Sequence, residues 1–138
     1  MIYFYNEDID LPVIDTTKYI DWIERIIHFH GKRTGEVSFI FCSDPYLLQI
    51  NKEYLNHDYF TDIITFNYNT DNELSGDIFI SLDTVRENAK EYKVSFSDEL
   101  RRVIIHGILH LVGFDDKTKE QKQIMRQKEE EAMNMFDS

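Results

Sequence analysis

The sequence predicts an α/β (α+β) fold, a single layered domain over residues 1–138 with a small mixed β-sheet of about four strands packed by helices. Apolar, β-branched runs alternate along the chain with segments of helical periodicity, which is typical of layered domains. Two of these runs are joined by the turn-rich stretch NTDNELSG, which favours a hairpin. A length of 138 residues is enough for one domain with a buried core.

The first part of the chain is expected to alternate strands with helices. Residues 1–5 and 36–42 are apolar runs typical of strands. Residues 16–30 have helical periodicity, with Gly31 as the expected stop. The apolar stripe of this helix consists of Ile20, Ile23, Ile26 and Ile27. A second helix, PYLLQINKEYL, is expected to start at Asp44, because Pro45 suits the first helical position.

The middle of the chain is expected to form the hairpin and a further helix. Residues 62–68 (DIITFNY) and 77–82 (DIFISL) are the two predicted strands. Residues 83–93 follow as a short polar helix.

The helix predicted over residues 97–112 differs from the others because apolar residues surround it, so it is expected to be central and buried. These residues are Val103, Ile104, Ile105, Ile108, Leu109, Leu111 and Val112. Gly113 is its expected end. Thr118 and Gln121 have the spacing of a capping box, which predicts a last helix that continues to about Met135.

The composition favours a globular protein of a reducing compartment. Cys42 is the only cysteine, so no internal disulfide can form, and the cytoplasm is the expected location. No apolar run approaches the ~20 residues that a membrane span needs. The N-terminal stretch MIYFYNEDID lacks the basic region and apolar run of a signal peptide. No membrane partner is expected.

The charge is strongly acidic overall but locally basic near the C-terminal end of the sequence. The formal net charge is −11, which by itself disfavours a nucleic-acid partner. The window 101–128 reverses this balance, with seven basic residues against the three acidic residues Asp115, Asp116 and Glu120. The basic ones are Arg101, Arg102, Lys117, Lys119, Lys122, Arg126 and Lys128. Such a patch can attract phosphate, although ordinary solvated helix faces would give the same pattern.

The stretch HGILHLVGFDD has the spacing of a catalytic metal site. His106 and His110 are four residues apart on a helix, so both imidazoles leave it on one face. Gly113 allows the chain to turn back, and Asp116 can then supply a third ligand. The resulting pattern H-x-x-x-H-x-x-G-x-x-D has the spacing of the metzincin zinc site, with Asp116 in place of the third ligand. Asp115 is the competing carboxylate. Three protein ligands leave a position for water on a zinc ion.

Two alternatives bear on this motif. Buried histidines can instead be core residues whose nitrogens bond backbone carbonyls, but the glycine and aspartate at ligand spacing favour the metal site. The second alternative is a protease, and Gly107 disfavours it. Zincin proteases carry at that position a glutamate that takes the proton from the metal-bound water. Hydrolysis of an ester whose leaving group is assisted elsewhere is still possible, because a metal-bound water has a lowered pKa.

The motif resembles the signature of the YbeY-like rRNA maturation ribonucleases, whose usual form ends in a third histidine. Two further blocks are similar to that family, namely NKEYLNHDYFTDIITF at residues 51–66 and GDIFIS at residues 76–81. The resemblance implies a zinc-dependent endoribonuclease that cuts single-stranded RNA in small-subunit rRNA 3′-end processing and late ribosome assembly. Its partners would be rRNA and the ribosomal small subunit or its assembly proteins. The alternative is a non-catalytic assembly factor that binds RNA and uses its metal to hold the fold.

Three residues depart from the family pattern. Asp116 replaces the usual third histidine, and its carboxylate also suits harder ions such as Mn²⁺. Leu55 stands where the family usually has an arginine that would meet phosphate charge. Phe60 replaces a usual proline. The candidates to supply the missing positive charge are Arg101, Arg102 and Lys117.

The remaining polar residues are given simpler interpretations. His28 and His30 point apart on a helix and are expected to be helix-end residues. His57 is expected in a loop, with lining of the cleft as the alternative. Asp77 is expected to be structural, with support of a ligating histidine as the alternative. Cys42 is expected to be inert in its strand, and the glutamate run at 129–131 to be a solvated helix face.

Overall fold

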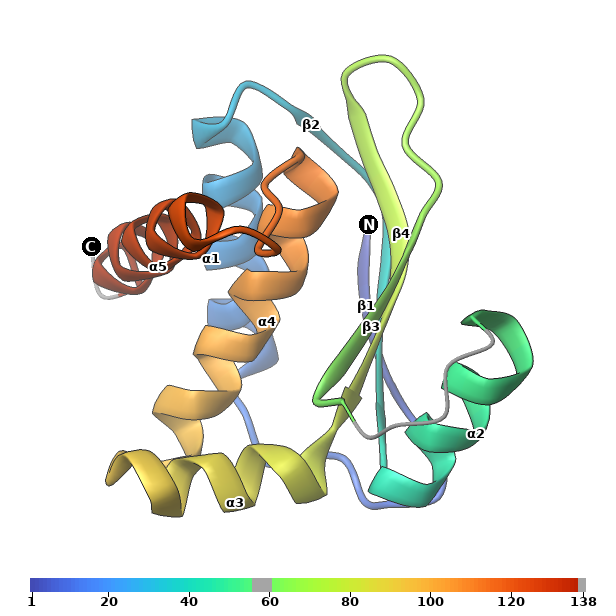
Figure 1. Cartoon of the computed structure of the whole chain (residues 1–138). Coiled ribbons are helices and arrows are strands. Elements are labelled where there is room, and N and C mark those ends of the chain that lie inside the picture. Colours follow the sequence, from blue (N-terminus) through green and yellow to red (C-terminus); the bar gives the residue numbers. More distant parts are fainter. Residues whose placement is uncertain (56–60, 137–138) are drawn as a thin grey trace.

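A four-stranded mixed sheet with strand order β1-β2-β4-β3 lies at the centre of the molecule (Figure 1). The computed structural model describes residues 1–55 and 61–136. Strands β1 (Ile2–Asn6), β2 (Arg33–Cys42) and β4 (Glu73–Ser81) are parallel, whereas β3 (Ile63–Asn67) pairs with β4 in the antiparallel direction. The predicted α+β class and the predicted hairpin are both confirmed.

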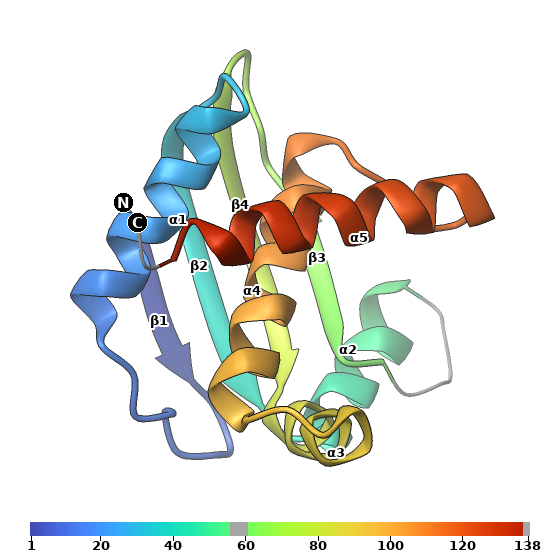
Figure 2. The ribbon, with the colours of Figure 1, turned by 90° about the vertical axis from the view of Figure 1, so that its left-hand side faces the viewer.

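Helices cover the sheet unequally on its two faces. Helices α1 (Thr16–Phe29) and α4 (Phe96–Val112) pack on one face, and α5 (Lys119–Asn134) crosses over the outer side of α4 (Figures 1 and 2). Helix α2 (Asp44–Leu55) lies on the opposite face, and α3 (Leu82–Tyr92) connects the end of β4 to α4. Within the described residues no helix is both long and apolar enough to cross a membrane.

Two strands begin earlier than the sequence predicts. Strand β2 starts at Arg33 instead of residue 36, and β4 starts at Glu73 instead of residue 77. The extra residues pair with each other, Arg33 with Glu73 and Thr34 with Leu74, beyond an irregularity in the ladder. Their backbone groups therefore pair with the neighbouring strand. The segment lacks the apolar alternation from which a strand is predicted.

The central position predicted for α4 is confirmed. The helix packs against α1, α3, α5, β3 and β4. Its apolar residues are buried almost completely, namely Leu100, Val103, Ile104, Ile105, Ile108, Leu109 and Leu111. The same core contains Trp22 of α1 and Phe39, Phe41, Ile78 and Ile80 of the sheet. A helix buried on most of its surface is a rigid support for any polar side chains it presents.

Helix α5 is anchored on α1 at its C-terminal end. The indole Nε1 of Trp22 donates a hydrogen bond of 2.8 Å to the carbonyl oxygen of Ala132. The ring of Phe136 packs edge-on against both Tyr19 and Trp22, at centroid distances of 5.4 and 5.1 Å. Arg25 of α1 adds a hydrogen bond of 2.9 Å to the carbonyl oxygen of Met135. These contacts hold α5 in place where it crosses α4.

Candidate metal centre

The two histidines of α4 face each other on its last two turns. The Nε2 atoms of His106 and His110 are 3.0 Å apart, and their rings meet edge-on with centroids at 4.6 Å. Each side chain is mostly buried, with 16% of His106 and 23% of His110 exposed. The expectation that both rings leave one face of the helix is correct.

Gly113 ends α4 and turns the chain back. It has φ of +126°, a backbone conformation that side-chain-bearing residues rarely adopt, and its N–H bonds the carbonyl oxygen of Leu109 at 3.1 Å. Three residues later, Oδ2 of Asp116 lies 3.2 Å from Nε2 of His106 and 3.6 Å from Nε2 of His110. Asp115, the competing carboxylate, is exposed and does not belong to this group.

The donor atoms fit one small divalent ion. Tetrahedral ligands about 2.0–2.1 Å from zinc lie roughly 3.3 Å from one another. The three separations between the Nε2 atoms and the Asp116 oxygen are 3.0, 3.2 and 3.6 Å, which bracket that value. Imidazole and carboxylate are ligands for zinc and similar ions. Within the described part of the chain this is the one group of three His, Cys, Asp or Glu side chains close enough to hold a metal.

Glu129 of α5 lies directly behind His106, where the sequence interpretation placed a solvated helix face. The Nδ1–H of His106 donates to Oε2 of Glu129 at 2.6 Å, and Glu129 is only 8% exposed. Glu130 and Glu131 are exposed, so the expectation is correct for them and wrong for Glu129. The signal was available in the sequence. Glu129 stands four residues after Met125 and three before Ala132, on the buried stripe of its helix.

The charges around the site shift its titratable groups in different directions. Burial opposes protonation of His106, but the hydrogen bond and charge of Glu129, with the charges of Asp116 and Asp62, outweigh it and raise its pKa. Burial and the neighbouring His106 lower the pKa of His110. Burial also raises the pKa of Asp62, against the opposing charges of His106 and Arg102. Asp62, which precedes β3, is a further titratable group of the site that the sequence pattern does not single out.

The three cations proposed to replace the family arginine differ in their availability. Arg102 is committed to carboxylates, with two hydrogen bonds to Glu99 at 2.9 and 2.7 Å. Arg101 pairs with Asp98 and lies over the ring of Phe136, 4.4 Å from its centroid. Lys117 is exposed and follows Asp116 directly in the sequence. Leu55 ends α2 with 39% of its surface exposed, and His57 and Phe60 lie outside the described residues.

Gly107 has a packing role that explains why no glutamate stands there. A Cβ atom at this position would lie 2.9 Å from Cδ1 of Ile63 and 2.9 Å from Cγ2 of Ile78. The residue after the first histidine therefore faces the sheet, not the donor atoms. A side chain at position 107 could not serve as the general base of a protease without displacing β3 and β4.

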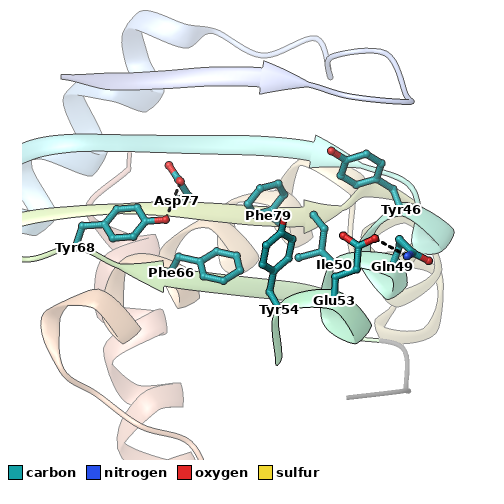
Figure 3. Close-up of a pocket in the computed structure, with 9 residues that line it drawn as sticks. All are labelled: Tyr46, Gln49, Ile50, Glu53, Tyr54, Phe66, Tyr68, Asp77 and Phe79. Carbon is teal, nitrogen blue, oxygen red and sulfur yellow. Dashed lines mark hydrogen bonds between the residues drawn. The ribbon is translucent and has the colours of Figure 1, made fainter. Parts of the chain in front are cut away.

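A groove on the opposite face of the sheet has a different character (Figure 3). It encloses about 480 Å³ between α2 and the β3–β4 pair and is lined by Tyr46, Gln49, Ile50, Glu53, Tyr54, Phe66, Tyr68, Asp77 and Phe79. Asp77 accepts a hydrogen bond from the Tyr68 hydroxyl at 3.2 Å, so the alternative that it supports a ligating histidine is wrong. Among the residues that the structure describes, the lining has two acidic side chains and no basic one, which does not favour RNA phosphates.

The other histidines that the structure describes are helix-end residues, as expected. His28 is exposed in the last turn of α1, and His30 is its C-cap residue. The His30 ring packs against Phe114, with centroids 5.6 Å apart.

The fold and the site together define an α+β protein with a His-His-Asp group able to hold one metal ion. The family model described as Endoribonuclease YbeY matches residues 3–137, and the chain belongs to that family. The relative named Endoribonuclease YbeY from Parabacteroides distasonis is 50% identical, over 96% of this chain and 93% of its own length. The relative of the same name from Bacteroides thetaiotaomicron is 48% identical, over 96% of each chain.

A solved structure supports the same fold. The solution structure of TM1509 from Thermotoga maritima superposes with a TM-score of 0.69 at 26% sequence identity, covering 99% of this chain and 89% of the other. The resemblance inferred from three short sequence blocks therefore extends over nearly the whole chain.

Proposed function

We propose that the protein is a metal-dependent endoribonuclease that cuts single-stranded RNA, with His106, His110 and Asp116 as the ligands of one zinc ion. The observation that carries the proposal is the separation of the three donor atoms, 3.0 to 3.6 Å, in a chain whose relatives are named endoribonucleases. The carboxylate of Asp116 makes Mn²⁺ the alternative ion. We place the protein in the cytoplasm as one folding domain over residues 1–138.

Different side chains around the site are assigned different roles in cleavage of the phosphodiester bond. A bound divalent ion would polarise the phosphate and lower the pKa of an attacking water. Glu129 orients the His106 ring, and burial raises the pKa of the Asp62 carboxyl, which makes it a candidate for proton transfer. The exposed lysines Lys117, Lys119 and Lys122 follow the site along the chain and attract the negative backbone of RNA.

The substrate proposed is the 3′ end of small-subunit rRNA, with the small subunit or its assembly proteins as partners. Support comes from membership of the family and from the basic stretch after α4 in an otherwise acidic protein. An unpaired strand is the proposed form of the substrate, because single-stranded RNA lets a protein reach individual nucleotides, whereas a duplex is recognised mainly by its shape.

The test compares the wild type with His110→Ala and with His28→Ala, the latter an exposed histidine distant in sequence from the site. We expect one equivalent of metal by elemental analysis in the wild type and in His28→Ala, and none in His110→Ala. Only the two proteins that contain metal, the wild type and His28→Ala, should cleave a single-stranded RNA. Equal cleavage by all three proteins would overturn the proposal, because a contaminating nuclease would then explain the activity.

The alternative is an assembly factor that binds RNA without cutting it. The observation in its favour is Leu55, which ends α2 where the family usually supplies an arginine. Retention of metal and of RNA binding by the wild type, with no cleavage at any concentration, would establish the alternative.

A further inference from the structure

A network of charged side chains extends from the metal centre into the contact between α4 and α5. Oε2 of Glu129 accepts the Nδ1–H of His106 at 2.6 Å, and Oε1 of Glu129 accepts from Nη1 of Arg102 at 3.4 Å. Arg102 also makes the paired hydrogen bonds to Glu99, and its Nη2 lies 4.0 Å from Oδ2 of Asp62. Each oxygen of Glu129 therefore has its own partner.

Because these charged side chains are buried, breaking the contacts between them would cost free energy. Glu99 is 2% exposed and Glu129 is 8% exposed, and buried carboxylates require paired, hydrogen-bonded partners. Arg102 is a shared partner for both. With Asp62 beside Arg102 and Asp116 in front of the histidines, the group has four carboxyl groups for one guanidinium and two imidazoles, and a divalent cation between the imidazoles would offset part of that negative charge.

We propose that Glu129 is a positioning residue for the metal centre, which holds His106 with its proton on Nδ1 and leaves Nε2 free for the ion, and that Arg102 holds Glu129 in turn. This inference rests on the metal site of the proposed function and deepens it. A neutral imidazole binds metal only through the nitrogen that lacks a proton, so the partner of the other nitrogen decides whether the correct one is available.

Replacement of the carboxylate by an amide, in Glu129→Gln, tests the idea sharply. The carboxylate of Glu129 accepts from both His106 and Arg102, whereas the amide in the variant has one accepting oxygen and one donating nitrogen. If the oxygen stays with Arg102, the amide nitrogen faces Nδ1 of His106 and favours the tautomer with its proton on Nε2. That tautomer cannot bind the ion through Nε2.

The experiment measures zinc affinity of the full chain by competition with a chromophoric chelator, in wild type, Glu129→Gln and Glu130→Gln. Glu130 is exposed on the same helix, so its substitution removes the same charge without touching His106. We expect Glu129→Gln to weaken zinc binding by ~10–100-fold and Glu130→Gln to leave it unchanged. Equal affinities in all three proteins would overturn the proposal.

A second readout separates positioning from a structural contact between helices. Nitrogen-15 NMR of the zinc-free protein, at a pH where His106 is neutral, reports which ring nitrogen carries the proton. We expect the Nδ1–H form in the wild type and in Glu130→Gln, and a shift toward the Nε2–H form in Glu129→Gln. A loss of thermal stability with an unchanged tautomer would show that Glu129 is structural only, and would overturn the proposal.

The role of Arg102 is tested through Glu129. If Arg102 acts by holding Glu129, Arg102→Gln weakens zinc binding in the wild-type background and has little further effect in the Glu129→Gln background. Independent, additive losses would contradict that role. None of these measurements uses RNA, so they can succeed if the protein proves not to cut RNA, and they can fail while cleavage is observed.

Discussion

At the scale of single residues, Gly107 decides how closely α4 approaches the sheet. An added methyl group would meet Ile63 and Ile78 at 2.9 Å, and one of the two atoms is the branch methyl of Ile78, which cannot move away freely. We expect Gly107→Ala to lower the free energy of unfolding by ~1–3 kcal/mol through overpacking, partly offset by about 1 kcal/mol of helix propensity.

Urea unfolding of Gly107→Ala beside the wild type is the measurement. A Gly107→Glu protein should be far less stable, because the longer side chain has no space between α4 and the strands. A folded Gly107→Glu protein with protease activity would contradict the placement of this residue against the sheet.

Cys42 is a second residue whose surroundings determine its chemistry. Its side chain is fully buried, and burial, with the charges of Asp8 and other acidic neighbours, raises its pKa to about 12. The thiolate is the reactive form, so the native protein should react with a thiol reagent such as DTNB only after denaturant is added. Rapid reaction of the folded protein would show that Cys42 is reached by solvent.

At the scale of elements, the end of α4 brings Asp116 to the histidines. Gly113 and Gly31 both have positive φ, both follow a helix, and neither would meet a neighbour with an added Cβ. We expect alanine at either position to cost roughly 1–3 kcal/mol of stability, because the backbone conformation is unfavourable for it. Gly113→Ala should also weaken zinc binding, whereas Gly31→Ala should not.

Zinc titration of the two glycine variants checks this difference. Gly31→Ala serves as the control for a positive φ after a helix, at +77° against +126° for Gly113, so a loss of metal shared by both would mean that instability, not the turn at Gly113, is responsible.

The order of the elements and the core of the metal motif could be predicted from the sequence, because both depend on local periodicity. The spacing of His106, His110 and Gly113 determines geometry within a few turns of one chain segment. The early start of β2 at Arg33 could not be predicted, since residues 33–35 form a strand only through pairing with the strand beside them. Glu129 lies in a run of three glutamates whose charge predicts a solvated face, although the buried positions four before and three after it place it on the buried stripe of α5.

At the scale of the whole molecule, metal binding should be coupled to folding. The donor atoms are assembled by α4, the turn after it and the packing of α5, so the unfolded chain lacks the site. Zinc at about 100 times its dissociation constant should add about 2.7 kcal/mol to the free energy of unfolding. Thermal unfolding with zinc and with chelator should show this gain in the wild type, and no gain in His110→Ala. A zinc-dependent gain that persists in His110→Ala would place the binding elsewhere.

The anchoring of α5 has a consequence for the newly made protein. Glu129 reaches His106 only when its helix lies across α4, and that placement depends on the hydrogen bond from Trp22 to Ala132 and on the ring of Phe136. During translation, α1 and α4 emerge from the ribosome before the segment that completes the site. The nascent chain would thus carry both histidines without their supporting carboxylate, and full metal affinity would arise only after residues through Phe136 have docked. The new protein would therefore bind its metal less tightly until α5 has packed across α4.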